Sequence, residues 1–161
     1  MPNPQRQLLS AVDMYIPEGR RFYTEGPRTG EPREKQSFIY SATFNGASAL
    51  TPLGTLTIGI AIDADSDFLA FNLSKISTLV NNVTFIPLLP ATILLTTTGG
   101  GSRLMDQPQH IENLAGQGGL PGIPPFPIWL PGSSVLQVQL TSLDPVNTFN
   151  VFVSFPGVKI F

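Results

Sequence analysis

The chain has 161 residues, of which 42% are hydrophobic but only 12% are charged, and it contains 15 Gly, 16 Pro and no Cys. This length accommodates one domain with a core of its own, and the lack of Cys excludes a disulfide framework and thiolate metal sites. The net charge of −2 provides no electrostatic attraction to the phosphates of nucleic acid, and every apolar run ends well before the ~20 residues of a membrane helix.

Residues 1–36 are predicted to form an extended, charged arm ahead of a domain that spans 37–161. Residues 1–40 hold 11 of the 20 charged residues, interleaved with Gly and Pro, and such a segment buries too little apolar area to offset the entropy of ordering it. A disordered tail without a role is the alternative. Against it stand apolar side chains that can pack on the chain's own domain or on a neighbour: Leu8, Leu9, Val12, Tyr15, Ile16, Phe22 and Tyr23. We expect Tyr15, Phe22 and Tyr23 to lie in an interface.

The remainder of the chain has the pattern of an all-β domain. Side chains alternate between two faces in segment 37–44, which leads into the turn Asn45-Gly46, and again in segment 55–62. Further β-like segments, separated by Gly and Pro, lie at 68–73, 80–88, 91–98, 135–141, 148–155 and 158–161. Residues 71–80 can instead hold one short helical turn. About eight short strands punctuated by turns predict a β-sandwich, and in particular a jelly roll.

A Pro/Gly-rich loop is predicted at 114–132, and it carries the only Trp of the chain. Loops of this length in compact domains are usually functional or disordered, and the apolar side chains within it argue against disorder. Two interpretations stay open: the loop covers a sheet edge or makes a subunit contact, or it is a long crossover between two sheets. Phe126, Ile128 and Trp129 are therefore candidate interface residues.

The chain offers few side chains for catalysis. His110 is the only histidine, there is no cysteine, and no Gly-x-Ser-x-Gly motif is present. A Ser-His-Asp triad would have to include His110, which lies in a strongly polar stretch. We therefore predict no catalytic residue, no cofactor and no enzymatic activity.

Three carboxylates lie in a row at Asp63, Asp65 and Asp67, with the spacing of the first three ligands of a calcium loop. The Gly and Glu that such a loop requires are replaced by Phe68 and Ser74. The three side chains can hold a hard cation loosely, or they can cap backbone amides in a turn. We favour the turn and predict no metal ligand.

The order of segments in residues 37–161 is similar to that of a known family. The segments are Gly54–Ile58, Asp65–Phe68, Pro87–Pro90, Ile93–Thr98, Pro125–Pro127, Leu130–Ser134 and Phe155–Ile160. In this order the chain resembles small accessory virion proteins of tailed bacteriophages, in which a β-sandwich or jelly roll decorates the capsid or sits at the neck. The resemblance implies homo-oligomers, attachment to major capsid or connector (portal) proteins, and a place in the virion after synthesis in the host cytoplasm. It transfers no site residue and does not cover the arm.

The leading hypothesis is a non-enzymatic phage virion structural protein: a capsid decoration, cement or neck-collar subunit that binds copies of itself and capsid or connector proteins, but neither nucleic acid nor a membrane. The alternative is a carbohydrate-binding jelly-roll module of a fibre or surface protein, with Trp129, Phe126 and Tyr40 as aromatic platforms. A third hypothesis is a polysaccharide hydrolase with paired carboxylates, although the sequence shows no such pair.

Overall fold

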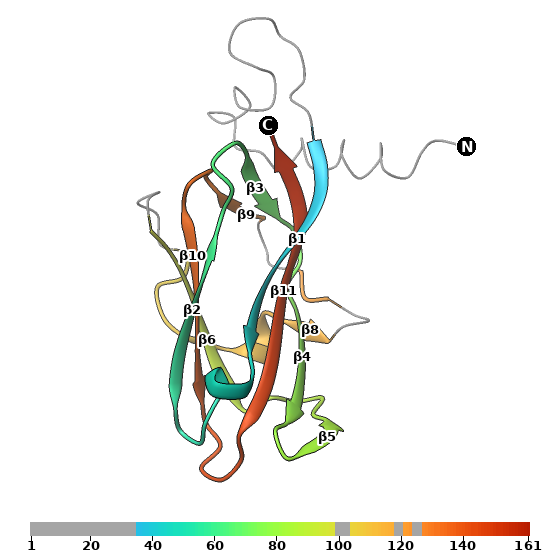
Figure 1. Ribbon diagram of the computed structural model, residues 1–161, viewed down its shortest axis with the longest axis vertical. Coiled ribbons are helices and arrows are strands. Elements are labelled where there is room, and N and C mark those ends of the chain that lie inside the picture. The colour runs from blue at the N-terminus through green and yellow to red at the C-terminus, as the bar shows by residue number, and fades with distance from the viewer. Residues whose placement is uncertain (1–34, 99–103, 118–120, 124–126) are drawn as a thin grey trace, which may run out of the picture.

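The computed structural model describes residues 35–98, 104–117, 121–123 and 127–161 (Figure 1). Strands account for nearly all of the regular structure in these residues, and the only helical elements there are two 3-10 turns, η2 (Gly46–Ser48) and η3 (Ile111–Asn113). The strands are β1 (Lys35–Phe44), β2 (Thr55–Ala61), β3 (Asp67–Ala70), β4 (Ser74–Leu79), β5 (Asn82–Phe85), β6 (Ala91–Thr98), β7 (Gln109–His110), β8 (Gly116–Gln117), β9 (Ile128–Leu130), β10 (Val135–Ser142) and β11 (Phe149–Ile160).

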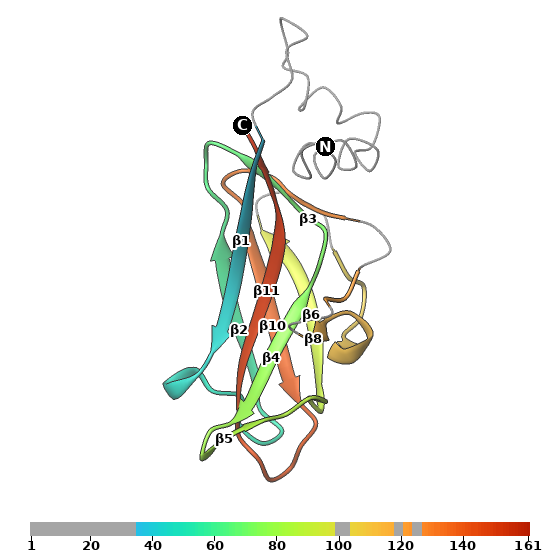
Figure 2. The same cartoon turned by 90° about the vertical axis from the view of Figure 1, so that its right-hand side faces the viewer.

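The strands form two sheets packed face to face. Sheet A has the order β5-β4-β11-β3-β9, with β1 on the other side of β11 and β8 beside β4, and sheet B has the order β2-β10-β6-β7. All pairs are antiparallel except β4 with β8. In Figure 2, β1, β11 and β4 of sheet A lie in front of β2, β10 and β6 of sheet B. The predicted all-β sandwich is thereby confirmed.

The long strand β11 organises sheet A because it is paired along both of its edges. One edge pairs with β1 over the whole length of that strand, from Lys35 opposite Ile160 to Phe44 opposite Val151. The other edge pairs first with β4 and then, from Gly157 onward, with β3. A single strand therefore holds together segments that come from the beginning, the middle and the end of the described chain.

The core lies between the sheets and follows from the alternation of side chains along the strands. The inward side chains of β1 and β11 are almost fully buried and face those of β6 and β10; they include Ala42, Phe44, Val151, Val153, Phe155, Ile93, Leu95, Leu136, Val138 and Leu140. Burying a large aliphatic or aromatic side chain contributes roughly 1.5–3 kcal/mol. A shift of one residue in any pairing would turn this set toward water, so the apolar pattern fixes the register.

Three details differ from the sequence expectations. Strand β1 begins at Lys35, inside the segment predicted as arm. Residues 74–79 form β4 and no helical turn, because their side chains alternate between buried and exposed positions and their backbone pairs with β11. The predicted loop at 114–132 contains β8 and β9, and β9 extends sheet A beyond β3. Strand β9 pairs with β3 at the margin of sheet A, while β7 before the loop and β10 after it belong to sheet B, so both interpretations of the loop stay predictions.

Gly157 lies where β11 crosses from its β4 partner to its β3 partner, and we expect Gly157→Ala to destabilise the fold. A β-carbon at this position would lie 2.2 Å from the carbonyl oxygen of Leu69 and 2.6 Å from Cζ of Phe68. Overpacking of this kind costs typically about 1–3 kcal/mol of unfolding free energy. Chemical denaturation measures the loss.

Gly59→Ala is the matched control for this substitution. On β2 the only atom near the added carbon is Cγ1 of Val135, at 3.1 Å, and a side chain can shift more easily than backbone. Equal losses of stability in the two variants would contradict the close approach of β3 and β11.

Candidate functional site

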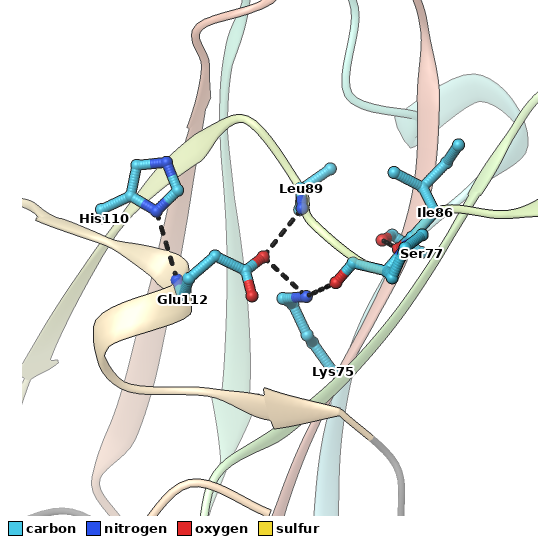
Figure 3. Close-up of polar contacts among 7 residues, drawn as sticks. Lys75, Ser77, Ile86, Leu89, His110 and Glu112 are labelled. Carbon is cyan, nitrogen blue, oxygen red and sulfur yellow. Dashed lines mark hydrogen bonds and ion pairs between the residues drawn. The ribbon is translucent and has the colours of Figure 1, made fainter.

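The inner face of sheet A carries a buried lysine near the short strands at its margin. Lys75 projects from β4 into the sandwich, and its side chain is 1% exposed. Its Nζ donates a hydrogen bond to the carbonyl oxygen of Pro87 at 3.0 Å and lies 2.7 Å from Oε1 of Glu112 (Figure 3). A buried ammonium group is tolerated only with such partners, because desolvation of an unpaired charge costs several kcal/mol.

Glu112 reaches the lysine from η3 and holds a second segment at the same time. Its Oε1 also accepts a hydrogen bond from the backbone N–H of Leu89 at 2.7 Å. The turn itself begins at His110, whose Nδ1 accepts from the backbone N–H of Glu112 at 3.4 Å. One carboxylate therefore ties β4, the connection between β5 and β6, and η3 together, and Figure 3 shows the three segments converging on it.

This Lys75 cluster (Lys75, Ser77, His110 and Glu112) has the geometry of a structural tie. The hydroxyl of Ser77 donates to the carbonyl oxygen of Ile86 at 2.8 Å, so its proton is engaged by the backbone and not by a base. His110 contacts a backbone amide and lies at the start of a turn. A nucleophile hydrogen-bonded to a general base, which acyl or glycosyl transfer through a side chain would need, is not formed by these four residues.

A second lysine lies on the inner face of β11. Lys159 forms an ion pair with Asp63, and its Nζ lies 3.7 Å from the centre of the Phe38 ring, a distance at which a cation–π attraction contributes. The hydrogen bond from Lys159, opposed by some desolvation, lowers the pKa of Asp63, and the same bond raises the pKa of Lys159. Asp63 follows β2, so the pair links sheet A to a connection that leaves sheet B.

The three aspartates after β2 do not converge on a common point. Asp63 pairs with Lys159, whereas Oδ1 of Asp67 accepts a hydrogen bond from the backbone N–H of Gly132 at 2.8 Å. Asp65 is exposed. Within residues 35–98, 104–117, 121–123 and 127–161, no three Asp, Glu or His side chains are grouped so that they could hold a metal ion. The one backbone amide bound by these side chains is that of Gly132, which is distant in the sequence and not part of the predicted turn, so the capping turn stays a prediction.

Two of the candidate interface residues lie in β9. Ile128 packs against the main core, and Trp129, opposite Leu69 of β3, packs against a small second cluster with Val158 and Ile160. Both are partly buried within their own chain. The other four candidates, Tyr15, Phe22, Tyr23 and Phe126, lie outside the described residues.

Tyr40, considered above as a platform for a sugar, is a core residue. It is 8% exposed, its ring meets those of Phe38 and Phe68 edge-on with centroids 4.8 Å away, and its hydroxyl oxygen accepts a hydrogen bond from the backbone N–H of Asp63 at 3.2 Å. The ring is therefore not available for stacking on a ligand.

The feature that sequence reasoning missed is the outer face of sheet A, formed by the outward side chains of β1, β11, β4 and β5. Four large apolar side chains are exposed there: Ile39, Ile76, Phe85 and Phe152. Ile76 and Phe152 lie directly opposite each other in neighbouring strands. Around them stand small uncharged groups, including Ser41 and Ser154, whose hydroxyls are 3.4 Å apart. The sequence did contain a signal for this face. In the alternating segments, the side chains that point away from the core are uncharged, although they face outward.

Comparisons with known proteins found no matching family model, curated protein or solved structure. In the part of the chain that the structure describes, no helix is long and apolar enough to cross a membrane.

We expect Glu112→Gln to lower the free energy of unfolding by about 3 kcal/mol, because it leaves the buried ammonium of Lys75 without an opposite charge. The double variant Lys75→Met/Glu112→Gln should recover most of that loss, since the charge itself is then gone. Denaturant titration of the two single variants and the double variant yields the coupling free energy. Asp65→Asn removes one exposed negative charge and serves as the control. A Glu112→Gln variant as stable as Asp65→Asn would show that the pair does not hold the fold.

The pair of Asp63 and Lys159 should stabilise the fold over a defined pH range. The lowered pKa of Asp63 provides stabilisation above its unfolded value of about 3.9, and this is lost as the pH falls through the folded value. The raised pKa of Lys159 provides stabilisation below its unfolded value of about 10.4, and this is lost as the pH rises through the folded value.

The measurement is an NMR titration of the Asp63 carboxyl group. In Lys159→Met its pKa should rise toward the ordinary range. Asp144 is the internal control, because hydrogen bonds from Asn147 and Val146 lower its pKa, and these bonds are independent of Lys159. An unchanged pKa of Asp63 in the variant would contradict the ion pair.

Proposed function

We propose that this chain is a non-enzymatic structural protein of a bacteriophage virion, a capsid decoration, cement or neck-collar subunit. In this proposal it stabilises or joins parts of the particle by binding copies of itself and capsid or connector proteins. The sequence resemblance to accessory virion proteins of tailed phages suggests this role, and the all-β sandwich is compatible with it. Fold alone does not define function, so the main support for this proposal has to come from the surface of the protein.

The outer face of sheet A is the observation that carries the proposal. Between residues 37 and 43 of β1, 74 and 78 of β4 and 150 and 156 of β11, the outward side chains include no charge, whereas Ile39, Ile76 and Phe152 are 60%, 45% and 38% exposed. Isolated exposed apolar residues need no explanation, but a neighbouring pair such as Ile76 and Phe152 favours a protein contact. An uncharged face creates no repulsion between identical copies, and symmetry multiplies each weak contact.

We also propose that the sandwich is a jelly roll, a fold of eight strands used by viral capsid and lectin domains. Its support is the nested order of strands. The first and last strands, β1 and β11, are neighbours in sheet A, and the next two inward, β2 and β10, are neighbours in sheet B. Further inward along the chain, β3 and β9 return to sheet A and β6 and β7 to sheet B.

Carbohydrate binding is the weaker proposal. Tyr40 is buried, and the indole of Trp129 packs on Leu69, Val158 and Ile160. Sugar sites require a flat aromatic platform beside carboxylates or amides. Of the three aromatic side chains considered for this role, Phe126 lies outside the described residues, and among the other two only Trp129 keeps an exposed part. Titration with a panel of glycans tests it directly, because binding over the indole would shift the only tryptophan fluorescence of the chain.

We expect the purified full-length protein to form a closed oligomer. Size-exclusion chromatography with light scattering, repeated over a wide range of protein concentration, measures its mass. The variant Phe152→Ser/Ile76→Ser removes the apolar pair from the outer face and should weaken association, while Val146→Ser, which alters an exposed apolar residue in the β10–β11 connection, should not.

Either of two results would count against the virion role. One is a protein that stays monomeric at the highest concentration. The other is a glycan that quenches Trp129 and binds the monomer tightly.

A further inference from the structure

We propose that β1 pairs with β1 of a second copy, antiparallel and about a twofold axis, so that sheet A continues from one molecule into the next. This inference rests on the proposed homo-oligomer and adds to the outer face of sheet A a second surface, the edge of β1, through which copies join. Its physical basis is the free edge of a strand, whose unpaired N–H and C=O groups are a template for another strand.

From Gln36 to Phe44, strand β1 is paired on one side only within the described part of the chain. It has 10 residues, its register with β11 runs without interruption, and its outward residues from Gln36 to Thr43 are largely exposed. Natural proteins usually protect such an edge with Pro, a bulge, a charge or a very short strand. From Gln36 to Phe44 the strand has no Pro, no Gly, no charge and no bulge.

The other margins of the two sheets contrast with β1. Away from β1, sheet A ends in β5, β8 and β9, and sheet B ends in β7, all of which have two to four residues. On the β1 side, sheet B ends in β2, which contacts β1 and has seven residues, one of them Gly59 (Figure 2). Among the residues that the structure describes, one side of the sandwich is therefore a long open edge, and the other ends in short strands.

The sequence of β1 is complementary to itself in the antiparallel direction. Pairing centred on Ile39 places Ser37 opposite Ser41 of the second copy and Lys35 opposite Thr43. No like charges then meet, and the two Ile39 side chains, each 60% exposed in the single chain, cover one another. Opposed β-branched apolar residues stabilise a strand pair, whereas like charges in the same positions destabilise it. The occupant that the strand fits best is thus another β1.

Cysteine cross-linking tests this pairing directly, because the chain contains no cysteine. In Ile39→Cys the two thiols would lie opposite each other, with β-carbons about 4.5–5.5 Å apart, close to the spacing of a disulfide. Mild oxidation should convert most of the protein to a covalent dimer, at least about tenfold faster than in Val146→Cys, since the pairing raises the effective thiol concentration. Val146 is 76% exposed and lies between β10 and β11, away from the edge.

A charge variant separates this inference from the proposed function. Ile39→Lys places two ammonium groups at the twofold axis and should lower the oligomer mass, whereas Val146→Lys, with the same net charge, should keep it. Circular dichroism and thermal unfolding confirm that both variants are folded. An oligomer that survives Ile39→Lys, together with an Ile39→Cys variant that does not cross-link, overturns the β1 pairing and leaves the virion role standing. A wild-type protein that is monomeric overturns both.

Discussion

The pairing of β11 along both edges is the constraint on which sheet A depends. This strand contributes Val151, Val153 and Phe155 to the core, supports β1 along one side, and divides its other side between β4 and β3. The change of partner from β4 to β3 requires glycine at position 157, because the backbone of β3 lies too close to β11 there to leave room for a β-carbon. The register of β1, β3 and β4, and with it the outer face that β1, β4 and β11 form, follows from their pairing with this one strand.

The few charges of the domain are used to attach connections to the sheets. Lys75 and Lys159 both project from sheet A into the sandwich, and each meets a carboxylate supplied by a connecting segment, Glu112 in η3 and Asp63 after β2. A buried ion pair is weak evidence for net stability, but breaking one is costly. This applies to Lys75 and Glu112, whereas Asp63 in the second pair is half exposed. With both of these lysines directed inward, the outer face carries no charge between residues 37 and 43 of β1, 74 and 78 of β4, and 150 and 156 of β11. These two lysines and their carboxylate partners thus hold connecting segments against sheet A.

Much of the fold could be predicted from the sequence, because segments 37–44, 55–62 and 135–141 alternate strictly and the core depends on that alternation. The short elements could not be predicted from the sequence. Strand β9 has three residues within a Pro/Gly-rich stretch and exists through its pairing with β3. The role of Lys75 was equally hidden, since a lysine in an amphipathic strand is expected to face water, and its partner Glu112 is distant in the sequence. The outer face was missed because the apolar side chains on the side of each strand that points away from the core were not considered.

The lack of charge on the outer face determines how its contacts respond to their surroundings. Attraction between ions weakens as salt is added, whereas contacts among Ile39, Ile76, Phe152 and their hydroxyl neighbours involve no ions to be screened. Apolar association has a different dependence, because it weakens on cooling. Any assembly formed through this face would therefore tolerate wide changes in ionic strength and would loosen in the cold.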